Sequence, residues 1–360
     1  MPAAIRSVSA NAYRVPTDAP ESDGTLEWDS TTLVVVEVQA AGESAIGYTY
    51  SDAAAAMVIG DRLAPLVLTR DAMHVESCWR DMTRAVRNIG IPGIAAAAIS
   101  AVDSALWQLK ANLLGIPLTA LLGVVHEGVP VYGSGGFTSY SIDRLQAQLA
   151  GWVEQGIPRV KMKVGREPNK DVERVRAARE AIGPGVELFV DANGAYGRKQ
   201  ALALAERFTE FDVRWFEEPV PSDDLDGLRF IRDRAPSTIE IAAGEYGYDL
   251  SYFRRMLDAG AVDVLQADAT RCLGITGLLQ VAALCDAYNV GLSTHTAPLL
   301  HLPAAAAIAR LAHLEYFHDH VRIEDMLFDD VVRPRSGMLH PADIQHGPAL
   351  RKAVAQKYAV

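Results

Sequence analysis

Eight short apolar runs alternate with amphipathic stretches between about residue 126 and residue 317. One of these stretches places Val172, Val175, Ala178 and Ile182 at helical spacing. Eight strands with helices between them predict an α/β fold built on a closed parallel barrel. The main alternative is an open doubly wound sheet, but no glycine-rich phosphate turn follows any early strand. The expected strands cover residues 129–134, 159–164, 186–191, 213–217, 239–244, 262–267, 290–294 and 313–317.

The first part of the chain has a different pattern. Two strand-like segments, at residues 5–14 and 31–39, enclose a polar segment at residues 18–30. Helical patterns follow, and strands followed by helices indicate an α+β unit. The expected helices lie near residues 51–67, 71–89 and 94–114. We therefore expect an α+β domain over residues 1–125 and the barrel over residues 126–322, with the tail at about 323–360 packing back on the first domain.

Composition narrows the class of protein. Hydrophobic residues make up 49% of the 360 residues, which allows a large packed core. A net charge of −11 with no basic run argues against nucleic acid as a partner. Cys78, Cys272 and Cys285 form no disulfide framework, and we find neither a signal peptide nor a membrane-spanning run. We expect a cytoplasmic protein that binds a small molecule, does not bind a membrane, and forms a homo-oligomer.

Polar side chains end seven consecutive predicted strands. In a parallel barrel these ends open into one shared mouth. Asp191, Glu217 and Glu245 come from three adjacent strands, where their charges would repel each other. A hard divalent cation resolves the repulsion, and oxygen ligands suit Mg²⁺, with Mn²⁺ as a substitute. The simpler alternative is that the three act separately as helix caps or salt-bridge partners. Glu218 is ambiguous, because strand alternation sends only one of two adjacent residues inward.

Lys161 and Lys163 are two residues apart on one strand, so both side chains face the same side. Two close ammonium groups depress each other's pKa, and a lysine with a depressed pKa is a usable base. Two alternatives remain open. The pair could be solvent-exposed, or one lysine could form a Schiff base, a chemistry that needs no metal.

His295 and Asp268 follow neighbouring strands, so a hydrogen bond between them would fix the histidine tautomer and raise its basicity. This gives a second acid/base group opposite the lysines. Glu315 ends the last strand, and it either hydrogen-bonds a substrate oxygen when protonated or fixes a lysine. His318 and His320 have the spacing of metal ligands, but they follow the last strand and we expect them in a loop.

Taken in order, these motifs resemble the enolase superfamily, and specifically its mandelate racemase subgroup. The matching segments, which span nearly the whole chain, are Ile99–Trp107, Lys161-Met162-Lys163, Val190-Asp191-Ala192-Asn193, Trp215-Phe216-Glu217-Glu218-Pro219, Gly244-Glu245, Asp268, Ser293-Thr294-His295 and His313-Leu314-Glu315. A lysine on the sixth strand would instead have indicated the muconate-cycloisomerase-like subgroup.

The resemblance implies a capping α+β domain on a (β/α)7β barrel. It also implies one Mg²⁺ held by Asp191, Glu217 and Glu245, which stabilises the enediolate formed when the proton α to a carboxylate is removed. In such enzymes Lys163 faces one side of the substrate, and His295, oriented by Asp268, faces the other. We expect Lys161, Asn193 and Glu315 to contact the substrate.

The fate of the enediolate is less constrained by the sequence. Reprotonation on the other face would make a racemase or epimerase of a 2-hydroxy acid. Protonation of a leaving β-hydroxyl by His295 would make an acid-sugar dehydratase, and lactone opening or closure would make a cycloisomerase. The polar segment at residues 17–25 lies where the family's cap covers the substrate, which favours a polyhydroxylated acid and a dehydratase. A catalytically silent barrel is the remaining alternative, although every acid/base position is filled.

Overall fold

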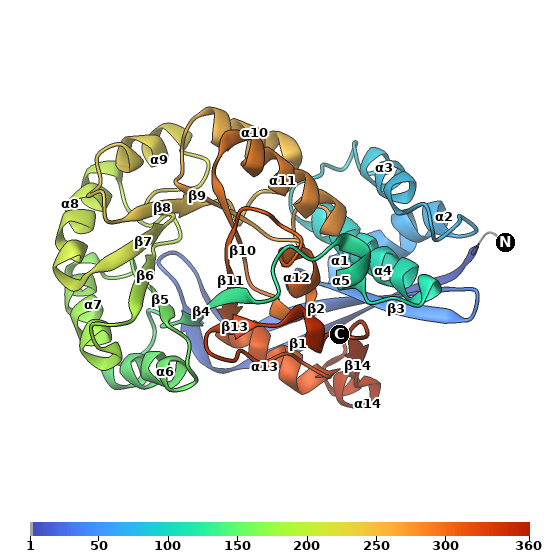
Figure 1. Ribbon diagram of the computed structural model, residues 1–360, viewed down its shortest axis with the longest axis horizontal. Coiled ribbons are helices and arrows are strands. Elements are labelled where there is room, and N and C mark those ends of the chain that lie inside the picture. Colours follow the sequence, from blue (N-terminus) through green and yellow to red (C-terminus); the bar gives the residue numbers. More distant parts are fainter. Residues whose placement is uncertain (1–2) are drawn as a thin grey trace.

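Eight parallel strands close into a barrel in the computed structural model, which describes residues 3–360 (Figure 1). Each strand pairs with the next, and β11 pairs back to β4 so that Glu315 lies beside Tyr132. All eight predicted strands are confirmed, with ends that differ by at most two residues. They are β4 (Val129–Gly135), β5 (Arg159–Lys163), β6 (Glu187–Asp191), β7 (Val213–Glu217), β8 (Glu240–Ala243), β9 (Val264–Ala267), β10 (Gly291–Thr294) and β11 (Leu311–Phe317).

A helix follows each of the first seven barrel strands and covers the outside of the barrel (Figure 1). Short side chains begin several of these helices, because they satisfy free backbone N–H groups. The side chain of Asp224 accepts from the backbone N–H of Gly227, and that of Asp249 accepts from Tyr252. The helices are α6 (Ile142–Glu154), α7 (Pro168–Ile182), α8 (Arg198–Phe208), α9 (Leu225–Arg232), α10 (Leu250–Asp258), α11 (Gly274–Tyr288) and α12 (Pro298–Ala305). The fold is therefore a (β/α)7β barrel.

Aromatic side chains fill the barrel interior below the mouth. Tyr132, Phe189 and Trp215 are buried there in contact with one another, and His313 packs against all three rings. Burial lowers the pKa of His313 to about 3, so this histidine is a neutral packing residue. Dense packing under the mouth gives the polar groups above it a rigid floor.

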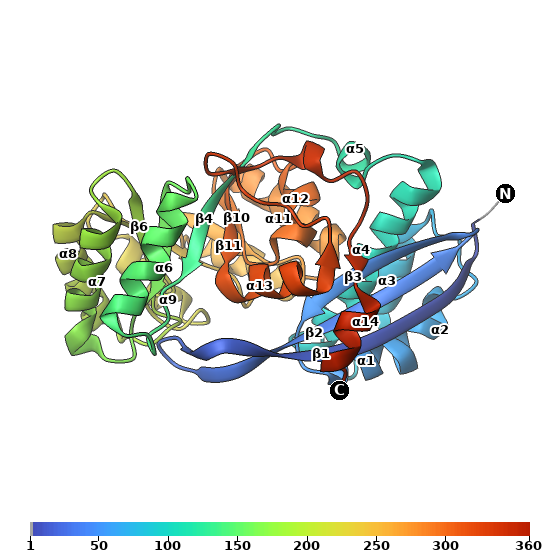
Figure 2. The same cartoon turned by 90° about the horizontal axis from the view of Figure 1, so that it is seen from below.

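The N-terminal part forms an antiparallel sheet in the order β1-β2-β3, comprising β1 (Ile5–Ser22), β2 (Glu27–Ala40) and β3 (Glu43–Tyr50). Two sequence expectations need correction. The polar segment 18–30 is largely strand, because the two strands extend into a long hairpin with a turn at residues 23–26. Strand β3 was not predicted. The hairpin reaches along the barrel, as seen from below in Figure 2.

Helix α4 (Ile94–Leu114) connects the cap sheet to the barrel, and its bounds match the prediction. It packs against β3, where Gly47 lies so close that a Cβ would approach the carbonyl oxygen of Ala101. On its other side Asp103 accepts hydrogen bonds from the backbone N–H (2.9 Å) and the hydroxyl (2.7 Å) of Thr276 in α11. The remaining helices of this part are α1 (Ala54–Val58), the π-helical η1 (Ile59–Leu63), α2 (Ala64–Val67), α3 (Val75–Ala85) and α5 (Leu118–Leu122).

The C-terminal segment contacts both parts of the molecule. Strand β13 (Met338–Leu339) pairs with β4 of the barrel, whereas Ala359 pairs with Tyr13 of the cap sheet. Its other elements are α13 (His318–Leu327), β12 (Phe328–Asp329), the 3-10 turns η3 (Pro341–Asp343) and η4 (Gln356–Tyr358), β14 (Ala349–Leu350) and α14 (Lys352–Ala355). Across residues 3–360, no helix combines the length and apolar character needed to cross a membrane.

Candidate active site

Three buried carboxylates converge at the barrel mouth. Asp191 ends β6, Glu217 ends β7 and Glu245 follows β8. Each side chain offers an oxygen within 4.8 Å of oxygens of the other two. Burial and the neighbouring Asp191 raise the pKa of Glu217 to about 8. The cluster thus holds more negative charge than the mouth can easily stabilise.

The donor set fits a hard divalent cation. All three ligand atoms are carboxylate oxygens of buried side chains at or just after strand ends, and oxygen ligands are the ones that Mg²⁺ prefers. Nearby, Glu218 is also buried, and its Oε1 has no hydrogen-bond partner in the described chain. Strand alternation does not apply to this residue, because the backbone leaves the strand at Glu218 with a φ of +39°. Both members of the Glu217–Glu218 pair are therefore buried.

Lys161 and Lys163 lie together on the same side of β5, as predicted. Lys161 Nζ lies 2.6 Å from Glu217 Oε1 and 3.5 Å from Asp191 Oδ2, and Lys163 Nζ lies 2.5 Å from the same Asp191 oxygen. The predicted depression of the lysine pKa is wrong. Burial and Lys161 lower the pKa of Lys163, but Asp191 outweighs them and raises it. A cation on Asp191 would compete for the same oxygen and weaken this effect.

His295 forms the expected hydrogen bond with Asp268 on the neighbouring strand, at 2.8 Å between Nδ1 and Oδ2. Its Nε2 points to the carboxylate cluster, 3.2 Å from Glu245 Oε2. Although burial alone would lower the pKa of His295, Glu245, Glu315 and Asp268 raise it to about 10. Asp268 itself has a lowered pKa despite its burial, because His295 donates to it. The carboxylate of Asp268 and its hydrogen bond thus favour the protonated form of His295.

Glu315 connects the two sides of the mouth. Its Oε1 lies 2.9 Å from Lys161 Nζ, and its Oε2 accepts from the backbone N–H of Thr296 at 3.1 Å. Burial would raise the pKa of Glu315, but Lys161 and His295 bring it down to about 2. Of the two roles considered from the sequence, the arrangement corresponds to the charged carboxylate that fixes a lysine.

These side chains open into a cavity of about 410 Å³ between the mouth and the cap. Lys163, Asn193, Glu245, His295 and Glu315 line it on the barrel side. The cap contributes mainly polar and aromatic groups from the hairpin and from the segment around the end of β3. These cap residues are Asp23, Leu26, Trp28, Ser30, Thr31, Thr32, Tyr50, Ser51 and Asp52.

The sequence pattern does not predict Arg271 as a residue of this cavity, and it predicts the wrong type of element for His320. Arg271 stands three residues after Asp268, and its guanidinium donates to the backbone carbonyl of Glu245 at 3.1 Å. His320, like His318, was expected in a loop, but both lie in α13. His320 lines the cavity and stacks on Tyr50 with ring centroids 3.5 Å apart. Burial and the nearby charge of His295 hold its pKa well below the usual range, so its ring is neutral.

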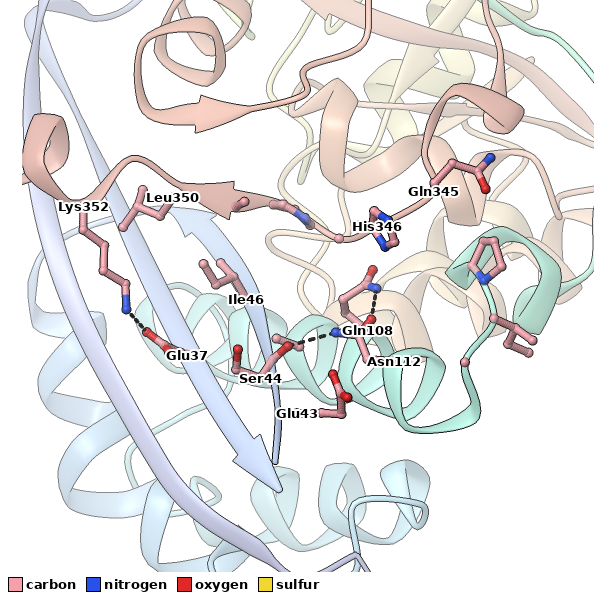
Figure 3. A pocket seen from close by; sticks show the side chains of 17 residues that line it. Glu37, Glu43, Ser44, Ile46, Gln108, Asn112, Gln345, His346, Leu350 and Lys352 are labelled. Carbon is pink, nitrogen blue, oxygen red and sulfur yellow. Dashed lines mark hydrogen bonds and ion pairs between the residues drawn. The ribbon is translucent and has the colours of Figure 1, made fainter. Parts of the chain in front are cut away.

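A larger cavity of about 640 Å³ lies between β3, the end of α4 and the tail (Figure 3). It includes none of the predicted site residues. Its charged Lys352 and Glu37 are paired with each other at 2.7 Å, and its polar Gln108 donates to Asn112 (Figure 3). Because these side chains are paired with each other, we assign no catalytic role to this cavity.

A capped barrel whose mouth carries three converging carboxylates, two lysines and an aspartate–histidine pair defines a class of metal-dependent enzymes. Two family models match the chain. Residues 10–123 match the mandelate racemase / muconate lactonizing enzyme N-terminal domain, and residues 144–349 match the enolase C-terminal domain-like family. The chain therefore belongs to the enolase superfamily, in its mandelate racemase/muconate lactonizing subgroup.

Known relatives include acid-sugar enzymes with different reactions. A 3,6-anhydro-alpha-L-galactonate cycloisomerase of Streptomyces coelicolor is 34% identical, with 88% of each chain covered. An L-talarate/galactarate dehydratase of Salmonella typhimurium is 30% identical, covering 88% of this chain and 79% of the relative. Membership of this family supports abstraction of the proton α to a carboxylate, but at this identity the relatives differ in the reaction that follows it.

Solved structures agree with the fold. A mandelate racemase/muconate lactonizing enzyme-like protein from Rubrobacter xylanophilus has 52% identity and a TM-score of 0.97, with 99% of each chain covered. A racemase from Streptomyces coelicolor with bound magnesium has 31% identity and a TM-score of 0.93, covering 99% of this chain and 100% of the other.

Proposed function

We propose that this protein is an acid-sugar dehydratase, which removes the proton α to a carboxylate and eliminates a β-hydroxyl as water. The observation that carries the proposal is the opposition of two acid/base groups across the carboxylate cluster. Lys163 contacts the cluster at Asp191, and His295 contacts it at Glu245. A substrate α-carbon between them would be exposed to a base on one face and to an acid on the other.

Asp191, Glu217 and Glu245 would hold the metal. Bound Mg²⁺ supplies positive charge that offsets the negative charge developing on the substrate carboxylate. The remaining steps belong to the side chains. Lys163 Nζ accepts the α-proton, and Lys161, anchored by Glu217 and Glu315, stays protonated and orients the carboxylate end.

His295 acts as the acid for the leaving hydroxyl. Its Nδ1 donates to Asp268, which leaves Nε2 directed toward the cavity with its proton. Glu245, Glu315 and Asp268 raise the pKa of His295, and the last two still favour the protonated ring when Mg²⁺ offsets the charge of Glu245. Transfer of the Nε2 proton to the β-oxygen releases water, and the resulting enol becomes a 2-keto acid.

The cavity favours a polyhydroxylated substrate. Thr31, Thr32, Ser51 and Asp52 offer hydrogen-bonding groups on the cap side. His320 Nδ1 and Asn193 Oδ1 are buried and unpartnered among residues 3–360, so each is available to a substrate hydroxyl or water. A substrate with several hydroxyls would satisfy these groups, whereas an aromatic acid would leave them unpaired.

A cycloisomerase is the second candidate, because the relative from Streptomyces coelicolor with 34% identity carries that activity. A cycloisomerase differs from a dehydratase in that the oxygen that leaves or attacks belongs to the ring of the substrate. The same two bases could also racemise or epimerise a 2-hydroxy acid, if His295 returned a proton to the α-carbon in place of the β-oxygen.

The test is a screen of acid sugars and their lactones in Mg²⁺ buffer, read for 2-keto acid formation and for α-proton exchange with deuterium. We expect a keto product that disappears in Lys163→Ala and His295→Asn and on full chelation. His126→Asn removes a histidine outside the cavity and should retain activity. Exchange or a new stereocentre without keto product would favour the racemase. Ring opening would favour the cycloisomerase, and borohydride trapping on Lys161 or Lys163 would exclude the metal-dependent account.

A further inference from the structure

We propose that Asp18, Glu21 and His318 form a second divalent-cation site, separate from the barrel mouth, which fastens the capping hairpin to the barrel. Each residue offers one ligand atom, and the three atoms lie within 4.8 Å of one another. Asp18 and Glu21 lie in the outer part of β1, and His318 is the first residue of α13. The site does not depend on the proposed function.

Helix α13 lies beside the hairpin formed by β1 and β2 (Figure 2). Arg322 of α13 donates to the backbone carbonyl of Pro16 at 2.7 Å, and the Thr31 hydroxyl donates to Asp319. These contacts join segments about 300 residues apart in the sequence. Ligands from both segments are therefore already placed in the folded protein, so a cation would not have to assemble them.

Glu21 gives an independent indication of a ligand. The residue is fully buried, and Trp28 Nε1 donates to its Oε2 at 2.9 Å. Its other oxygen, Oε1, is buried and has no hydrogen-bond partner within residues 3–360. A buried carboxylate oxygen without a partner is costly, and a cation bound at this oxygen would remove that cost. The proton is the rival occupant, because burial and Asp319 raise the pKa of Glu21 to about 8.

The donor set indicates the kind of ion. One imidazole with two carboxylates suits Zn²⁺ and similar transition ions better than Mg²⁺ or Ca²⁺. His318 Nε2 lies 3.2 Å from Asp18 Oδ2, and both residues are partly exposed, which provides an entry path. Arg144 is the competing cation, since its guanidinium lies 3.3 Å from Asp18 Oδ1.

Binding at this site would act on the catalytic cavity indirectly. Trp28, which Glu21 holds by a hydrogen bond, lines that cavity, and so does Phe317, which precedes His318. An ion would therefore immobilise one wall of the cavity and restrain the hairpin over the mouth.

The test uses Zn²⁺ as the probe on the full chain in excess Mg²⁺. We expect equilibrium dialysis to find one more Zn²⁺ per chain in the wild type than in Glu21→Gln, His318→Asn or the partly exposed Asp18→Asn. His126→Asn, a histidine outside the cluster, should bind as the wild type does. Because Asp18→Asn removes a partly exposed group, it keeps the comparison valid if Glu21→Gln fails to fold.

Two further readouts locate the ion and its effect. Anomalous diffraction at the zinc edge should give a peak between the three side chains, and Zn²⁺ should slow hydrogen exchange of the hairpin in the wild type alone. Equal zinc content in the wild type and all three variants, or a peak only at Asp191, Glu217 and Glu245, would overturn the proposal and leave a proton on Glu21.

Discussion

The substitution Asp268→Asn isolates the contribution of the aspartate to His295. It preserves side-chain shape but removes the charge that accepts from His295 Nδ1 at 2.8 Å. The amide can also present an N–H to the ring, which would favour the wrong tautomer. Since His295 and Lys163 contact different carboxylates, the change should affect one face of the substrate and spare the other.

The magnitude follows from the geometry. With charge centres about 4 Å apart and an effective dielectric of about 20, the lost attraction is about 4 kcal/mol. This corresponds to a pKa lower by about 3, which would bring His295 from about 10 to about 7. Because the acid step needs protonated His295, turnover should fall as pH rises through about 7 in the variant, and only near 10 in the wild type. At pH 8 the smaller protonated fraction alone should lower kcat about tenfold, and the wrong tautomer should add to this loss, up to the roughly 100- to 10,000-fold that a positioned general acid contributes.

The assay compares dehydration with α-proton exchange in deuterium oxide across pH 5–10. Exchange catalysed by Lys163 should persist while dehydration falls. The control is Asp171→Asn, a buried carboxylate outside the cavity that is held by Gly165 and Tyr196. Equal losses of exchange and dehydration, or a variant pH profile that matches the wild type, would refute the division of roles between the two faces.

Three predictions concern stability. Lys161→Met leaves Glu217 and Glu315 without the cation that they share. Urea unfolding of the protein without added metal should show a free energy of unfolding lower by about 3–5 kcal/mol, and an unchanged midpoint would contradict the ion-pair account. Burial raises the pKa of Asp103 to about 7 although Thr276 donates to it, so wild-type stability should fall by up to about 4 kcal/mol as pH rises from about 4 to 7. Asp103→Asn should remove that slope, and a retained slope would assign it to other groups. Gly47→Ala would place a Cβ 2.1 Å from the carbonyl oxygen of Ala101. We expect it to lower the free energy of unfolding by about 1–3 kcal/mol or more, and with it the melting temperature. Gly60→Ala is the control, because the space around Gly60 is open, and it should leave the melting temperature unchanged.

The pKa values of Lys161 and Lys163 are raised, opposite to the depression that their spacing predicts. The spacing of Lys161 and Lys163 predicts two cations that repel each other. In the folded chain Glu217 and Glu315 raise the pKa of Lys161 most, and Asp191 raises that of Lys163. A lysine base at this position therefore depends on what occupies the carboxylate cluster, which is a reason for proton abstraction and metal binding to be coupled.

The sequence by itself determined the barrel and most of the mouth. The alternation of apolar runs and helical stretches fixed eight strands, and a parallel barrel brings every strand end to one opening whatever the sequence distance. Asp191, Glu217 and Glu245 could therefore be grouped without coordinates, as could Asp268 with His295. Local pattern was sufficient there because strand order follows chain order.

Only the tertiary structure decided what lies between elements that are distant in the chain. The placement of His318 beside Asp18 depends on a contact between residues 300 apart in the sequence, which periodicity cannot report. The extended hairpin strands and the unpredicted strand β3 depend on antiparallel pairing with neighbouring strands, between residues at most 35 apart. Glu218 is buried because the backbone turns at a positive φ, contrary to strand alternation. The charge states of Lys163 and Glu315 were likewise decided by their neighbours, since a buried group takes its pKa from the charges packed around it.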